Sequence, residues 1–578
     1  MKNENQYGGI KQVLAVSIGL FLVFVDSTVV NIALPTIIDE YSITLDLASW
    51  VINAFVITLA VLLVTFGKLA DIFGRFKIFL LGLIIFTISS FLCGIAPNVE
   101  MLIISRCLQG MGGAMVIPTS MMLVRTAVPP EKLGMAMGIW GAVGALAVAI
   151  GPTLGGVLTE FIDWRWIFYI NIPIVVGLFP FILLAFRGHK DSKSPFRLDI
   201  LGVITLSISL YLLTYAILQG EQLGWTSKAI YLYFGSSIIM SILFIFIQKK
   251  VKHPLVDLTI FKNRYYIAGV LANLLGGLLL MGTLVLIPLY LIQVKGYDTL
   301  ESSLLITPMS AVMLVVAPLI GKIIDRIGYF FPMTIGYLFT LAGCILLFNL
   351  DVETELGHLI FIMSILGTGL GILMVTSVAV STASVSDQHI SLGSSIFATS
   401  RNIGGAVGVA LFVSLTLSFL NANSTDIIED GLTNIEELNI PPKIKEQIVS
   451  EFYNQENNYF EGKNQLNTFN ISEEMKNQVI AKEKQEILQT LPEGTTTLPL
   501  ETEEKIVTNV ETEFTLMEEK VSRIQNDVVN NIQTELVNAM TKAFLAGIGL
   551  TALFSTSLIL LRRKKMNSIV KQTIPKKI

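Results

Sequence analysis

The chain has 578 residues, of which 53% are hydrophobic and only 15% are charged, and its mean hydropathy is +0.68. Soluble domains carry about 25% charged residues. This composition therefore argues against a soluble protein, and it excludes a disordered chain, a nucleic-acid binder and a disulfide-rich secreted module. The small net charge of −4 conceals a division, because residues 421–537 hold 23 acidic and nine basic residues while the rest of the chain is basic.

Fourteen apolar runs are long enough for membrane-spanning helices, since one span needs about 20 mostly apolar residues. The runs lie near residues 11–34, 47–67, 77–97, 100–122, 134–159, 166–186, 199–219, 228–248, 266–291, 302–320, 331–350, 357–381, 395–420 and 538–561. Buried helices of a soluble core are the alternative, but such helices usually have shorter apolar runs. The sequence predicts an all-α polytopic membrane protein with fourteen transmembrane helices.

Lysine and arginine mark the cytoplasmic side of a membrane protein. They concentrate after the even-numbered runs, as at Arg187, Lys249 and Lys250, whereas acids such as Asp39 and Glu40 follow the odd-numbered runs. This pattern predicts a multi-pass protein of the cell membrane with cytoplasmic N- and C-termini. The acidic segment 421–537 follows the thirteenth run and is expected to be extracellular.

An internal repeat indicates two related halves. The stretch GKLADIFG at residues 67–74 recurs as GKIIDRIG at residues 321–328, each time directly after a span. Two parallel six-helix halves are typical of secondary transporters, with a site at their interface. We expect a six-helix half at 1–198, an inserted helix pair at 199–264, spans 9–13 of the second half at 265–420, the extracellular insert at 421–537, and the last span with a basic cytoplasmic tail at 538–578.

Asp26 and Arg106 are the candidates for proton or cation coupling. Ionisable residues inside a span are costly and usually functional. Counting from the outer ends of spans 1 and 4, and allowing about 1.5 Å per residue, puts the two side chains at similar depth. We expect them to pair across a cavity. The alternative is a permanent salt bridge that only joins two helices.

The repeated loop suits a gate, because Asp71 is an anion that could meet a helix N-terminus, for example near Ser391, and Arg75 is its available partner. The alternative is a plain orientation signal. The candidate gating residues are Gly67, Asp71, Gly74, Arg75, Asp325 and Arg326, with Arg401 as a candidate for an inner gate.

Span 5 combines small residues with a proline. Gly151 and Gly155 form a GxxxG face for close helix packing, to which Gly156 adds, and Pro152 removes one helical hydrogen bond. Generic packing of small residues is the alternative interpretation.

Nothing in the sequence suggests catalysis. The four histidines are scattered over loops and span ends, so they give no metal-ligand spacing, and no phosphate-binding GxxxxGK[ST] stretch occurs. We expect no enzyme activity, no metal, no cofactor and no use of ATP.

Four motifs together resemble the major facilitator superfamily, and specifically its fourteen-helix drug:proton antiporter-2 family. The stretch DSTVVNIALP at 26–35 is similar to that family's first-span motif, and GKLADIFGR at 67–75 is similar to motif A. Arg106 with Gln109 and the following glycines resembles motif B, and residues 138–156 resemble the antiporter motif C. Ile72 and Ala147 depart from the usual motif residues. The resemblance does not cover 421–537.

The resemblance implies proton-coupled efflux, by alternating access, of hydrophobic and often cationic drugs or toxic compounds. The expected partners are these substrates, protons and the lipid bilayer, with no nucleic acid. Dedicated export of a native lipid, nucleotide or metabolite is an alternative. A membrane-anchored surface receptor that acts through 421–537, with an extracellular partner, is an alternative of another class.

The acidic insert is expected to be mostly helical. Val507, Val510, Phe514, Met517, Val521, Ile524 and Val528 follow one another at steps of three and four. This heptad spacing is typical of a helix that packs on another helix, and the stripe continues through Ile532 and Leu536 towards the last span. The alternative is a disordered acidic loop, which the Asn- and Glu-rich residues 453–470 favour.

Overall fold

The structure is a computed structural model that describes residues 9–189, 191, 195, 198–386, 389–436, 476, 477, 480, 481, 483–485, 487 and 498–561. Every regular element among these residues is a helix, which confirms the all-α prediction. The chain forms two compact units. The transmembrane unit comprises Met1–Pro288, Tyr297–Ser414 and Thr541–Ile578, and the insert unit comprises Leu289–Gly296 and Leu415–Met540.

Within the described ranges, fourteen helical stretches are long and apolar enough to cross a membrane, as predicted. The first six runs correspond to α1 (Gly9–Tyr41), α2 (Leu45–Phe73), α3 (Arg75–Gly94), α4 (Val99–Ala127), α5 (Leu133–Phe161), and α6 (Trp166–Tyr169) with α7 (Asn171–Ala185). The next runs are α8 (Ile200–Leu218), α10 (Lys228–Lys250), α11 (Arg264–Gln293), α12 (Thr299–Ile327), α13 (Phe330–Phe348), α14 (Leu356–Ser384), α15 (Ile390–Glu436) and α18 (Leu500–Ser555). Short helices α9 (Gly220–Leu223), η2 (Pro130–Lys132), η3 (Leu258–Lys262) and α19 (Leu558–Leu561) complete the set.

The sixth predicted span is divided, which the apolar run alone did not reveal. Its helix stops at Tyr169 and resumes at Asn171. Pro173 explains the division, because proline has no N–H for the carbonyl four residues earlier and its ring clashes with that carbonyl. The residue four positions before Pro173 is Tyr169. Pro173 itself lies in the first turn of α7, where proline is tolerated.

Polar residues placed before several spans fix where the helices begin. The Asn98 side chain accepts a hydrogen bond from the Met101 N–H at 2.9 Å, and Asp298 accepts one from the Glu301 N–H at 2.7 Å. Such N-caps satisfy backbone donors that have no partner inside the helix. The position at which each of these helices begins is therefore determined by a capping residue that directly precedes the apolar run.

The first copy of the repeated loop ends in a sharp turn between α2 and α3. Gly74 has a φ of 112° there, a backbone conformation that residues with a Cβ rarely adopt. The Asp191 carboxylate accepts a hydrogen bond from the N–H of Phe76 at 3.1 Å in the first turn of α3. The corner therefore depends on a glycine and on an anion supplied from a distant part of the sequence.

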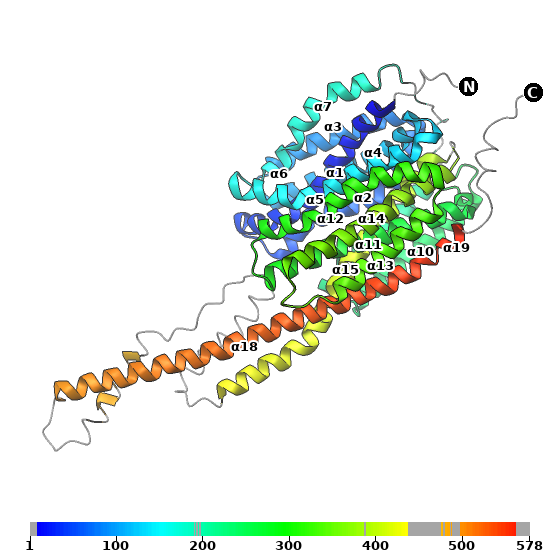
Figure 1. Cartoon of the computed structure of the whole chain (residues 1–578). Helices are drawn as coiled ribbons and strands as arrows, with labels where there is room; N and C mark the ends of the chain where they lie inside the picture. Colours follow the sequence, from blue (N-terminus) through cyan, green and yellow to red (C-terminus); the bar gives the residue numbers. More distant parts are fainter. Residues whose placement is uncertain are drawn as a thin grey trace, which may run out of the picture. The chain divides into compact units, whose positions relative to one another are not determined.

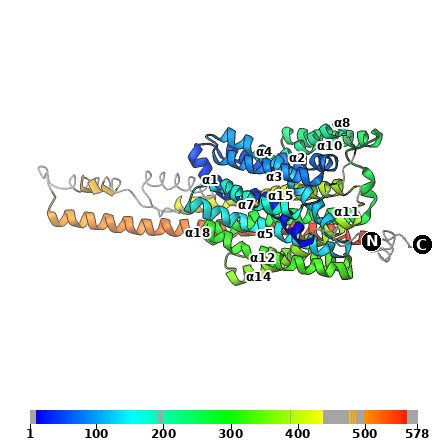
Figure 2. The ribbon, with the colours of Figure 1, turned by 90° about the horizontal axis from the view of Figure 1, so that it is seen from above.

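Helices of the transmembrane unit pack in two neighbouring groups (Figure 1). In one group α1 packs on α5, and α4 packs on α2 and α3; in the other α14 packs on α12 and α13. α5 contacts both α12 and α14 and so joins the groups. The predicted inserted pair, α8 and α10, pack on each other, and α8 also contacts α2 (Figure 2).

The insert unit confirms the predicted helical stripe. α18 continues from Leu500 to Ser555 in one helix, so the insert runs into the last span without interruption. Phe514, Val521 and Val528 are buried along it, and so are the neighbouring stripe positions Val510, Ile532 and Leu536. Ion pairs of 3.2 Å from Lys476 to Glu518 and 3.1 Å from Lys484 to Glu503 join helical residues of 476–487 to α18 in antiparallel order. The predicted helix start at 472–474 and residues 453–470 lie outside the described residues.

We expect a charge in this stripe to loosen the insert. Phe514 is 3% exposed, and removing a buried phenylalanine side chain costs about 3–5 kcal/mol, so Phe514→Asp should expose the amides of 500–535 to rapid hydrogen exchange. Leu516 on the opposite face is 52% exposed, and Leu516→Asp is the matched control that should retain protection. Equal exchange in the two variants would contradict the packing of this stripe.

Candidate functional site

The two predicted coupling residues form a direct ion pair inside the transmembrane unit. Asp26 lies on α1 and Arg106 on α4. Nη1 of Arg106 donates a hydrogen bond to Oδ2 of Asp26, and both side chains are fully buried. Nε of Arg106 also donates to the carbonyl oxygen of Val51 at 3.0 Å. The depth argument from the sequence thus identified a real contact between two helices.

Neutral polar side chains satisfy the other oxygen of Asp26. Oδ1 accepts hydrogen bonds from the side-chain amides of Gln109 at 2.8 Å and Asn171 at 3.2 Å. Both amides also donate to the hydroxyl of Ser90, at 2.7 and 3.1 Å, and Oε1 of Gln109 accepts from Arg106 at 2.6 Å. The resulting network ties α1, α3, α4 and α7 together around one carboxylate.

Aromatic rings close the space around the pair. The guanidinium carbon of Arg106 lies 4.4 Å from the centre of the Phe55 ring and 5.8 Å from that of Phe168, distances at which a cation is attracted to an aromatic face. The expectation of a pair across a cavity was therefore wrong. The side chains touch directly, and aromatic rings and side-chain amides pack around them.

Sequence reasoning missed Ser90 and Asn171 as members of this network. The signal that could have found them is the presence of hydrogen-bonding side chains in otherwise apolar spans, where an unpaired polar group is costly. Gln109 was noted only as part of motif B. Gln109 forms one hydrogen bond with Arg106 and one with Asp26, so it bridges the two members of the ion pair.

The repeated loop lies on the face of the transmembrane unit where α1 begins, which we call the N-terminal face. Oδ1 of Asp71 accepts a hydrogen bond from Nη2 of Arg75 at 3.1 Å and another from the hydroxyl of Ser391, near the start of α15. Gly67 lies directly against Ser395 of the same helix. The expected meeting of Asp71 with this helix start is present, while its role as a gate stays a prediction.

The second copy of the loop makes the corresponding contact. Asp325, in the last turn of α12, accepts hydrogen bonds from the backbone N–H groups of Gly134 at 2.9 Å and Met135 at 3.2 Å. These groups open α5, so the carboxylate meets the positive end of a helix dipole. Arg326 is exposed in the same turn. Each copy thus reaches a helix start in the other half of the repeat, which the sequence did not specify for Asp325.

We expect Asp71→Asn to loosen the N-terminal face. The change removes the ion pair with Arg75 and weakens the bond from Ser391, and a hydrogen bond to a charged group contributes about 1.5–3 kcal/mol. With Ser395→Cys as a buried reporter in a background without other cysteines, maleimide labelling should become roughly tenfold faster. Asp39→Asn, at the exposed far end of α1, is the control. Unchanged labelling and unchanged turnover would reduce the loop to an orientation signal.

Small residues of α5 let α1 approach closely, as predicted. The hydroxyl of Thr28 lies against Gly151, and a Cβ built on Gly155 would lie 2.7 Å from the carbonyl oxygen of Val29. Pro152 lies inside α5 between these glycines, and Gly156 has more room, since a Cβ built on it would lie 3.5 Å from its nearest neighbour, Leu300. This contact packs α5 against the part of α1 that carries Asp26.

Arg401 lies deeper than a gate at the helix start would require. It is about three turns into α15, and its guanidinium carbon lies 4.5 Å from the centre of the Phe24 ring on α1. Phe24 precedes Asp26 by about half a turn. The predicted role at an inner gate stays a prediction, and the position itself is nearer to the level of the buried ion pair than to Asp71.

Helices of this length around a buried ion pair, with a repeated loop at one face, define a polytopic membrane transport protein. Residues 16–409 match the Major Facilitator Superfamily, and the chain belongs to this superfamily. This confirms the resemblance that the motifs indicated.

Named relatives agree with this assignment. The chain is similar to the multidrug resistance protein Stp of Mycobacterium tuberculosis, with 29% identity over 440 residues that cover 76% of this chain and 80% of the relative. It is similar to multidrug resistance protein 3 of Bacillus subtilis, with 32% identity over 404 residues, 69% of this chain and 78% of the relative. The crystal structure of the human organic anion transporter MFSD10 matches 70% of this chain and 93% of its own, with a TM-score of 0.52 and 14% identity, which shows a shared fold.

Proposed function

We propose that the protein exports hydrophobic, mainly cationic, drugs or toxic compounds in exchange for protons. The observation that carries this proposal is the fully buried Asp26–Arg106 pair, whose carboxylate lies inside the span of a transporter. The names of the multidrug resistance relatives support the substrate class. The proposal has the proton gradient, rather than ATP, as the source of energy, and involves no enzymatic step or bound cofactor.

Charge placement supports an orientation for this export. Basic residues such as Lys68, Lys249 and Lys250 lie in the last turns of spans that end on the N-terminal face, so we assign that face to the cytoplasm. The acidic insert then belongs to the extracellular side. Outward transport in this orientation runs from the face with the repeated loops to the opposite face.

A proton on Asp26 would change the network around it. The carboxylate accepts hydrogen bonds from three groups, on Arg106, Gln109 and Asn171. A protonated carboxyl group gains an O–H donor that needs an acceptor and has less capacity to accept, and the attraction between Asp26 and Arg106 falls. Proton uptake therefore alters the contacts between α1, α4 and α7, which is the local change that alternating access would use.

The test is transport in everted membrane vesicles with an imposed pH gradient. A panel of cationic, neutral and anionic compounds, together with native metabolites, should show accumulation of the cations when the vesicle interior is acidic. Vesicles from cells without the protein give the background. Accumulation that ignores the pH gradient would overturn proton coupling, and accumulation of metabolites alone would overturn the drug substrate class.

We expect one proton to be exchanged per cycle through Asp26. Export of a monovalent cation would then move no net charge and would not respond to the membrane potential, which otherwise contributes about 2.3 kcal/mol per charge per 100 mV. Collapsing the potential with valinomycin and potassium, at a constant pH gradient, should leave the rate unchanged. A strong loss of rate would reveal a second coupled proton.

A further inference from the structure

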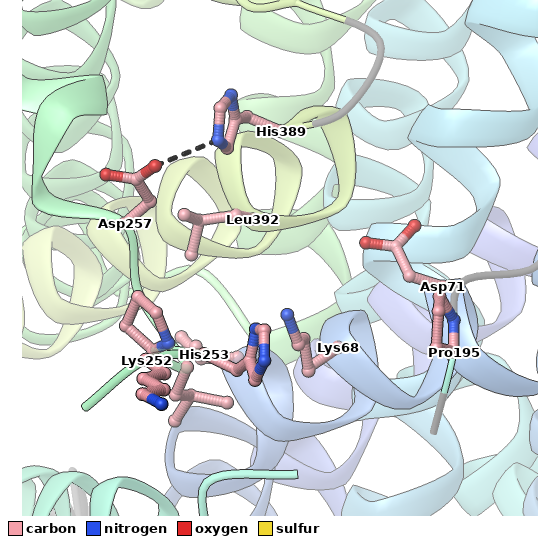
Figure 3. A pocket seen from close by; sticks show the side chains of 11 residues that line it. Lys68, Asp71, Pro195, Lys252, His253, Asp257, His389 and Leu392 are labelled. Carbon is pink, nitrogen blue, oxygen red and sulfur yellow. Dashed lines mark hydrogen bonds and ion pairs between the residues drawn. The ribbon is translucent and has the colours of Figure 1, made fainter. Parts of the chain in front are cut away.

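A polar cavity lies on the N-terminal face, away from the buried ion pair. Its volume is about 410 Å³, and it is enclosed by the end of α2, the segment that follows α10, and the start of α15 (Figure 3). Val64, Leu255 and Leu392 give it apolar walls. Pro195 and Pro254 also line it, and the remaining lining residues are two lysines, two histidines and two aspartates: Lys68, Lys252, His253, His389, Asp71 and Asp257.

The two acidic residues of the cavity already have hydrogen-bond partners in the protein. Asp71 is held by Arg75 and Ser391. Oδ2 of Asp257 lies 3.0 Å from Nε2 of His389, and its Oδ1 accepts a hydrogen bond from the Thr259 N–H at 2.9 Å. The Thr259 N–H and hydroxyl, followed by His389, hold the pKa of Asp257 below its usual range. Both carboxylates are therefore engaged with protein groups.

Two lysines bring positive charge to the cavity. Lys68 comes from α2 and Lys252 from the segment after α10, and neither forms an ion pair with any other residue that the structure describes. In Figure 3 the side chain of Lys68 extends to that of His253, and Lys252 lies on the same side of the cavity. Ammonium groups that line a cavity can bind the oxygen atoms of an anion.

We propose that this cavity binds a phosphate-bearing anion. Lysine ammonium groups are point charges that bind phosphate well, whereas both ring nitrogens of His389 already lie within hydrogen-bond distance of Ser386 and Asp257. Lys68 is in the last turns of α2 and Lys252 directly follows the last residues of α10, so the cavity lies at the level where lipid phosphates are found in a bilayer. Basic pockets between spans at this level hold anionic lipid headgroups. A headgroup and a soluble phosphate ester share this chemistry.

Binding in this cavity would also join three parts of the chain. Its walls come from α2, the segment after the inserted pair, and α15, and the Asp71–Ser391 contact lies at its edge. A ligand that contacts all three stabilises the arrangement in which they lie together. The inserted pair thereby acquires a role at the N-terminal face that does not depend on which compound is exported.

The experiment measures binding to the purified full-length protein in neutral detergent. Short-chain phosphatidylglycerol and phosphatidylcholine are titrated with native mass spectrometry as the readout, and glycerol 3-phosphate and inorganic phosphate are titrated by calorimetry. The test variant is Lys68→Gln/Lys252→Gln. The control is Lys249→Gln/Lys262→Gln, which removes the same charge from exposed lysines that do not line the cavity. Melting temperatures establish that each variant is folded.

We expect the wild type to bind phosphatidylglycerol and the test variant to bind it about tenfold or more weakly, since each lost charged hydrogen bond has a large effect. The control should stay within about twofold of the wild type, by the same relation. Binding of phosphatidylglycerol alone identifies a lipid as the source of the anion, and binding of glycerol 3-phosphate as well identifies a site open to soluble esters. Absence of binding in the wild type, equal binding in the test variant, or an equal loss in the control would overturn the proposal. Because no transport is measured, these outcomes are independent of the proposed export.

Discussion

The Asp26→Asn variant is expected to lose pH-driven export, with transport falling to the background of vesicles that lack the protein. Asparagine has nearly the shape of aspartate and can keep hydrogen bonds to Gln109 and Asn171, but it cannot take up or release the proton. The measurement is substrate accumulation against a gradient in everted vesicles, normalised to the amount of folded protein. Active export at the wild-type rate would exclude Asp26 as the coupling residue.

The Asp26→Asn variant needs a control for folding, because the substitution also removes the ionic partner of Arg106. Arg106 is fully buried and Asp26 is its ionic partner, so Asp26→Asn leaves a guanidinium group without a counter-ion. The double variant Asp26→Asn/Arg106→Gln removes both charges and should fold better, yet it should still not export. Loss of transport in both variants assigns the effect to the missing proton rather than to misfolding.

The spans and the ion pair show most clearly how much of the structure could be predicted from the sequence. Apolar runs predicted all fourteen spans, because a helix that crosses the bilayer needs its apolar residues in one continuous stretch. The heights of Asp26 and Arg106 followed from the rise per residue of a helix. Height along the membrane normal does not give the rotation of a helix about its own axis, so the sequence could not show that the two side chains touch.

Tertiary packing decided the features that the sequence did not predict. Ser90 and Asn171 join the network because α3 and α7 face α1, and no spacing along a single helix contains that information. The pair of His389 and Asp257 joins residues 132 positions apart. By contrast, the stripe of α18 was predicted well, because a heptad pattern is local and states directly which face of the helix is buried.

The alternative of a purely structural salt bridge makes its own prediction about stability. A buried ion pair is often matched or exceeded in stability by neutral residues of similar shape, whereas removing one partner alone costs about 3–5 kcal/mol. For this pair, the loss of stability should depend on which of the two partners is removed. A guanidinium group keeps its charge in proteins, while a buried carboxylate left alone can take up a proton and become neutral.

We therefore expect Asp26→Asn to lower the free energy of unfolding by about 3–5 kcal/mol and Arg106→Gln to lower it by less. The double variant Asp26→Asn/Arg106→Gln should recover most of the loss, since Gln109, Asn171 and Ser90 can still hydrogen-bond to neutral side chains at both positions. Chemical denaturation of the purified protein in mixed micelles measures the three values, and the wild type closes the cycle. A double variant that is both stable and competent in pH-driven export would show that the pair only joins α1 to α4. A double variant that is stable but inactive in export separates the two roles, because the charges are then dispensable for the fold and required for coupling.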